Sequence, residues 1–163
     1  MKKIIFGLML IASLTACGGT SGNPTANANL TFSSATGGYN GSLEPITSNV
    51  TVVNLLVTTT QGSGAGKRVF GVSLPQNSRD EGVTYVVKNV TNASLNYSEG
   101  DSSPSKIWSV TGGSIKVVKK SGKTLIFELI GVTLGKLAGD TGPSLGSVTV
   151  NGTIGGDSIT PLQ

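Results

Sequence analysis

The amino-acid sequence predicts an all-β protein with a single antiparallel domain of about eight to ten strands. Apolar and polar residues alternate in several short segments, and clusters of Gly, Pro, Asn and Ser separate these segments. No extended window combines the helical period with good helix formers. Evenly spaced short strands without helices are typical of a β-sandwich or of a small barrel or partly closed clam.

Individual strands follow from this alternation. In segment 92–98, Ala93, Leu95 and Tyr97 would share one face and polar residues the other. Segments 50–60 and 125–134 are more continuously apolar and β-branched, so we expect them either to be buried on both faces or to lie centrally in the sheet. The remaining predicted strands are 68–74, 83–87, 107–111, 114–120 and 147–154.

Turns are predicted where Gly and Pro gather. The clearest hairpin joins 114–120 to 123–134 through Ser121-Gly122, because Gly readily takes the positive φ of a tight turn. The other predicted turns are 37–38, 62–66, 75–79, 100–104, 112–113, 139–143 and 155–156.

Composition excludes several chemistries. The 163 residues include no His and one Cys, and 12% are charged. Without His there is no Ser-His or Cys-His catalysis and no imidazole metal site. One Cys allows neither a disulfide within the chain nor a multi-cysteine metal site. We therefore expect no metal and no cofactor. The one group that we expect to be attached is a covalent lipid, which the N-terminal segment predicts.

The first segment has the pattern of an export signal. Lys2 and Lys3 precede an uncharged apolar run from Ile4 to Leu14. This run is too short to cross a bilayer as a helix, which takes about 20 residues. A short basic region followed by a short apolar region is typical of a secretory signal peptide.

The end of this segment, Leu14-Thr15-Ala16-Cys17, resembles a bacterial lipobox. The resemblance covers about the first 19 residues. It implies that the signal peptidase recognises Leu14, Thr15 and Ala16, and that cleavage precedes Cys17. It also implies a diacylglycerol thioether on Cys17 and a location in a bacterial cell envelope. Gly18, rather than Asp, resembles the outer-membrane sorting pattern of diderm bacteria.

The chain thus divides into a signal peptide (1–16), the lipidated Cys with a flexible linker (17–29) and a β domain (30–163). Cleavage removes Lys2 and Lys3, which lowers the formal charge from +4 to +2 and argues against a nucleic-acid partner. The β domain is loosely similar to uncharacterised all-β exported lipoproteins in segments 108–117 and 146–154. That similarity implies no activity.

Four lysines, Lys116, Lys119, Lys120 and Lys123, gather around the predicted hairpin turn. One interpretation is contact with anionic lipid headgroups or polyanionic envelope polymers. The alternative is a solvated hairpin tip whose lysines discourage edge-to-edge aggregation.

Other polar and aromatic residues are weaker candidates for a binding or catalytic site. Segment 62–68 lacks the spacing of a phosphate-binding loop, and segment 99–103 offers oxygen ligands without the EF-hand spacing. Glu128, inside an apolar run, either faces water or pairs with a lysine. We expect turn positions for Asp80, Glu81, Glu99 and Asp101, core positions for Trp108, Tyr85 and Tyr97, and exposure for Tyr39.

These observations favour a membrane-anchored envelope lipoprotein whose β domain is structural or binds a protein or glycan, without catalysis. The alternative is a carrier or sensor of a small apolar ligand held inside a barrel or clam. A third hypothesis is a hydrolase that uses a carboxylate pair or a Ser-Lys pair.

Overall fold

The computed structural model describes residues 27–36, 43–47, 50–53, 56–100, 106–135, 146–159 and 162. The signal peptide, Cys17, Tyr39, Asp101 and the predicted turns 37–38 and 139–143 lie outside these residues. Within the described part of the chain, no helix is long and apolar enough to cross a membrane.

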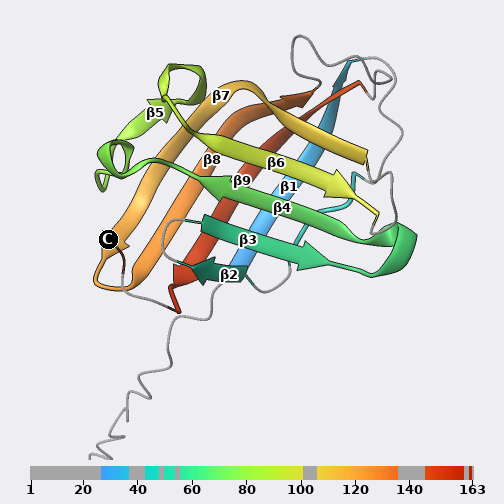
Figure 1. Cartoon of the computed structure of the whole chain (residues 1–163). Helices are drawn as coiled ribbons and strands as arrows, with labels where there is room; N and C mark the ends of the chain where they lie inside the picture. Colours follow the sequence, from blue (N-terminus) through green and yellow to red (C-terminus); the bar gives the residue numbers. More distant parts are fainter. Residues whose placement is uncertain are drawn as a thin grey trace, which may run out of the picture.

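The prediction of an all-β antiparallel domain is confirmed (Figure 1). One sheet contains its strands in the order β1-β9-β8-β7-β6-β4-β3-β2, and β5 pairs with β7 beside this path. Its strands are β1 Asn27–Thr36, β2 Val50–Val53, β3 Leu56–Gln61, β4 Arg68–Ser73, β5 Thr84–Val86, β6 Ser94–Glu99, β7 Lys106–Ser121, β8 Thr124–Gly135 and β9 Ser147–Asp157. In the described segments between these strands there are three short 3-10 turns, at Gly64–Gly66, Gln76–Ser78 and Val87–Asn89.

The sheet curls until its two edges approach each other, so the architecture is a nearly closed barrel. Val52 of β2 forms a parallel bridge with Ser158, just beyond β9, and the amide of Ile159 donates to the Val52 carbonyl at 2.9 Å. At the other edge, Leu30 of β1 and Ile46 exchange two backbone hydrogen bonds of 2.9 Å. These contacts satisfy backbone groups that an open sheet edge would expose.

Alternation along the strands fills the barrel interior with side chains. Phe70 and Val72 of β4, Tyr97 of β6 and Phe127 of β8 have no accessible surface. A side chain without accessible surface borders no cavity large enough for water, so this part of the interior is packed. Strand β8 lies between β9 and β7, so the expected central position is confirmed for it, whereas its alternating burial shows that it is not buried on both faces.

Two predicted boundaries near the start of the domain are wrong. Strand β1 begins at Asn27, so residues 27–29, assigned to the linker, belong to the sheet. They do so because Asn27 pairs with Gly155 and because Ala28 is buried. The predicted strand 50–60 is instead the hairpin of β2 and β3, in which Val53 pairs with Leu56.

Two glycine pairs predicted as turns lie inside long strands. Strand β7 continues through Gly112 and Gly113, where bulges shift its register against β8. Strand β9 continues through Gly155 and Gly156, whose φ angles are 153° and 152°. In both places the glycine allows a close approach of neighbouring backbone rather than a reversal of the chain.

The predicted hairpin between β7 and β8 is confirmed, with its turn one residue later than expected. Ser121 pairs with Thr124, so Gly122 and Lys123 form the turn, and Gly122 has φ 58°. The predicted strand 83–87 is shorter, because the chain leaves β5 after Val86 and enters a 3-10 turn at Val87.

Gly155 provides a test of the close approach between β9 and β8. A Cβ atom at this position would lie 2.2 Å from the carbonyl oxygen of Leu125. We expect Gly155→Ala to lower the free energy of unfolding by about 1–3 kcal/mol, measured by urea denaturation. Gly66→Ala is the matched control, because nothing lies within 4 Å of its Cβ position. Equal stability of the two variants would contradict this account.

Candidate functional site

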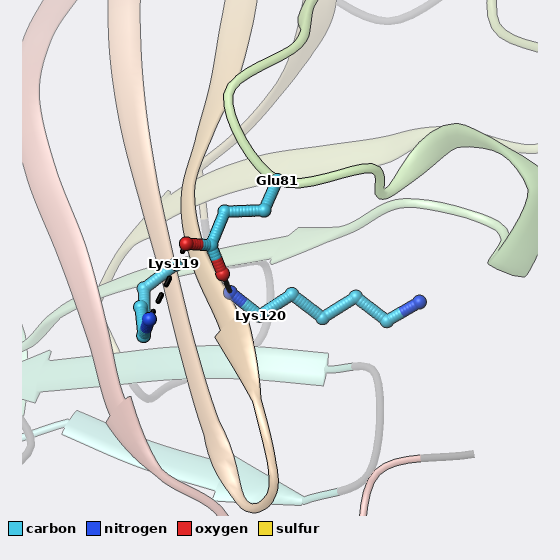
Figure 2. A network of polar contacts seen from close by, with 3 residues as sticks. All are labelled: Glu81, Lys119 and Lys120. Carbon is cyan, nitrogen blue, oxygen red and sulfur yellow. Dashed lines mark hydrogen bonds and ion pairs between the residues drawn. The ribbon is translucent and has the colours of Figure 1, made fainter.

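The predicted lysine cluster lies at the β7–β8 hairpin, where an acidic residue from another segment joins it. The ammonium group of Lys119 is 3.3 Å from Oε1 of Glu81, and the backbone amide of Lys120 donates to Oε2 at 2.9 Å (Figure 2). Glu81 lies in the turn before β5, as expected, and this segment runs beside β7 because Gly82 donates to the carbonyl of Val117.

The four lysines therefore do not form one uniform patch. Lys119 is paired with Glu81, and the side chain of Lys120 extends away from that of Lys119 (Figure 2). Lys116 lies opposite Glu128 in the β7–β8 register, and Lys123 is exposed in the turn itself. Glu128 is half-buried. Its sequence neighbours Phe127 and Leu129 are buried and lie on the opposite face of β8.

The contacts of Glu81 lower the pKa of its carboxyl group. The largest cause is the hydrogen bond from the Lys120 amide, and the side-chain hydrogen bond from Lys119 comes second. A carboxyl group with a lowered pKa stabilises the folded state at neutral pH and loses that effect in acid.

This shift predicts a pH-dependent stability difference. We expect wild type to have a higher Tm than Glu81→Gln at pH 7 and the difference to disappear as the pH falls below about 4.3, the ordinary glutamate pKa, and through the lowered folded value. Thermal unfolding followed by circular dichroism measures it. Lys119→Ala should keep most of the pH dependence, since the Lys120 amide remains. A Tm difference that does not vary with pH would refute the prediction.

A second polar cluster lies inside the barrel around Arg68, which is buried at the start of β4. Its Nε donates to the Tyr97 hydroxyl at 2.7 Å, and its Nη1 donates to the carbonyl of Glu44. The Tyr97 hydroxyl in turn donates to Glu99. The guanidinium carbon lies 4.6 Å from the centre of the Phe32 ring, a cation–π distance. The cluster thus joins β1, β4, β6 and the segment before β2.

The sequence did not reveal this cluster, because Arg68 was considered only against a phosphate-binding loop and as the first residue of the predicted strand 68–74. The signal was present in the alternation of β4, which places Arg68 on the same face as Phe70 and Val72. Neither residue type nor spacing indicated that Tyr97 would supply a hydroxyl acceptor inside the core. The predicted core positions of Tyr97 and Trp108 are confirmed, whereas Tyr85 is only partly buried.

Arg68 provides a second stability test. We expect Arg68→Ala to lower the free energy of unfolding by about 3–5 kcal/mol, because it removes a buried cation and leaves its partners without a donor. Lys67→Ala is the control, because Lys67 is the preceding residue and is partly exposed. Urea denaturation measures both. A loss for Arg68→Ala no larger than that for Lys67→Ala would show that the cluster does not stabilise the barrel.

Arg79 is a second buried arginine that the sequence did not reveal. Its side chain has 0% exposure, and its Nε donates to the Pro75 carbonyl at 2.9 Å. Its Nη1 and Nη2 atoms have no hydrogen-bond acceptor in the structure of the described residues. Burial lowers the pKa of the guanidinium.

The outer surface has a shallow groove of about 330 Å³ at the point where β7 diverges from β6. Ser109 donates to Asn96 at 3.2 Å, and Asn96 donates to Ser94 at 2.9 Å. The lining residues are Ala93, Ser94, Leu95, Asn96, Ser109 and Val110. Its volume is at the lower limit of ligand pockets, and its position differs from the interior cavity expected for a carrier.

Four carboxylates among the described residues are bound to neighbouring groups. Asp80 accepts from the Tyr85 hydroxyl at 3.2 Å, and Asp157 accepts from Thr124 at 2.6 Å. Glu81 and Glu99 are engaged as described above. Among the described residues, no three His, Cys, Asp or Glu side chains are close enough to hold a metal ion.

Comparisons with known proteins give no relative. No protein-family model matches the chain, no curated protein matches its sequence, and no solved structure matches its fold.

Proposed function

We propose that this protein is a lipid-anchored component of a bacterial cell envelope, and that its β domain binds or supports a partner without catalysis. The observation that carries the proposal is the segment Leu14-Thr15-Ala16-Cys17 directly after a short apolar run. Two or three acyl chains on one cysteine give durable attachment, whereas one chain binds a membrane only marginally.

The packing of the barrel favours recognition of a partner by the outer surface rather than by the interior. Side chains without accessible surface fill the space in which a barrel-type carrier holds its ligand. The carboxylates Asp80, Glu81, Glu99 and Asp157 hold neighbouring donors in place, which is a structural use. Recognition of a protein or glycan in the envelope would then use the outer surface and the barrel ends.

The anchor has a direct test. We expect Cys17→Ser to abolish incorporation of radiolabelled palmitate and to leave the protein as an unprocessed precursor or in the soluble fraction. Ser13→Ala, a substitution outside the four-residue motif, is the control and should be labelled and fractionate like wild type. Equal labelling and membrane association of wild type and Cys17→Ser would overturn the proposal.

A further inference from the structure

The first strand and the lysine-bearing hairpin lie at the same end of the barrel. Asn27, the first residue of β1, pairs with Gly155 of β9. Gly155 pairs with Ile126 of β8, and Ile126 pairs with Lys119 of β7. Figure 1 shows the start of β1, the end of β9 and the β7–β8 turn on the same side of the molecule.

Three exposed apolar side chains lie at this end. Val53 and Leu56 are paired neighbours in the β2–β3 hairpin and are 45% and 47% exposed, while the adjacent Val52 and Val57 are buried. Ile159 is 71% exposed, and its amide binds the carbonyl of Val52 at 2.9 Å. Exposed apolar residues brought together by separate strands mark a contact surface more often than isolated ones do.

Basic side chains accompany these apolar residues. The carbonyl of Lys123 accepts from the amide of Ser158 at 2.8 Å, so the hairpin turn lies against the segment that carries Ile159. Of the acids at this end, Asp157 is bound by Thr124 and Glu81 by Lys119. Lys120 and Lys123 therefore provide the basic part of a tether-side face, which we define as Val53, Leu56, Lys120, Lys123 and Ile159.

The length of the chain before β1 brings this face close to the anchor. Nine residues lie between Cys17 and Asn27, so even a fully extended connection of ten Cα-to-Cα steps reaches no more than about 36 Å. A tether this short gives the face a high effective concentration at the membrane surface, so that weak contacts suffice. Apolar side chains flanked by lysines fit the boundary between acyl chains and anionic headgroups.

We propose that the tether-side face docks on the anionic headgroups of the membrane that holds Cys17, with Val53, Leu56 and Ile159 at the acyl boundary. This inference rests on the proposed lipid anchor. Docking at this end turns the opposite end, where β7 begins at Lys106, and the outer wall of the barrel toward the envelope partner.

The test uses the lipidated protein, which begins at Cys17, in vesicles of phosphatidylethanolamine and phosphatidylglycerol. Leu56→Cys and Ile159→Cys each introduce a thiol for a polarity-sensitive fluorophore, because lipidation blocks Cys17. Ile107→Cys is the matched control, since Ile107 is 57% exposed near the opposite end of β7. Co-flotation with the vesicles reports on the anchor separately from the position of the face.

We expect probes at residues 56 and 159 to shift to shorter wavelength and to resist quenching by iodide, while the probe at residue 107 behaves as in water. Lys120→Glu with Lys123→Glu should reverse this shift without loss of co-flotation. Lys67→Glu with Lys88→Glu makes the same charge change elsewhere and should not. If the protein co-floats with the vesicles but the probes at residues 56, 107 and 159 all report an aqueous environment, the docking proposal is overturned and the proposed anchor still stands.

Failure to co-float would refute the anchor itself, and with it the docking. A shift that grows with the protein density on the vesicles would mean that a second copy covers the face, which would also overturn the inference. The same shift in phosphatidylcholine vesicles, unaffected by the lysine substitutions, would refute the part of the proposal that assigns anionic headgroups.

Discussion

The closure of the sheet, in which the edge strand β2 meets the chain beyond β9 and the edge strand β1 meets Ile46, determines most of this structure. A single antiparallel sheet with one apolar face must cover that face, and here it does so by curling until Val52 reaches Ser158 and Ile159. Closure encloses the side chains of β4, β6 and β8 in one packed interior. It also satisfies backbone groups at an edge that would otherwise invite pairing with another chain.

The packed interior contains a charged guanidinium group, and the stability of this group depends on the closure of the barrel. Arg68 contacts Phe32 and Tyr97 and binds the carbonyl of Glu44, so its guanidinium is satisfied only when β1, β4, β6 and the segment before β2 are assembled. A buried cation is costly without such partners. The cluster thus penalises partly assembled arrangements and favours a single native arrangement of the barrel.

The same closure connects the fold to the proposed function. It brings Val53 and Leu56 from β2 and β3 beside Ile159, and it brings the β7–β8 turn against the same segment through Lys123. Asn27, through which any anchor at Cys17 must act, begins β1 at this end. A barrel held by that end would keep its packed interior intact and use only its surface for recognition.

The sequence alone determined the strand class and the antiparallel hairpin at Gly122, because period-two alternation is a local property. It also placed Tyr97 and Trp108 in the core, because large aromatic side chains are the usual packing units of a small β domain. The predicted lipid anchor also rests on local sequence. Tertiary structure decided the inclusion of Gly113 and Gly155 within long strands and the closure into a single barrel. It also decided the partners of Arg68 and the pairing of Glu81 with Lys119. Each depends on which distant backbone lies alongside, and residue spacing along one segment carries no information about that neighbour.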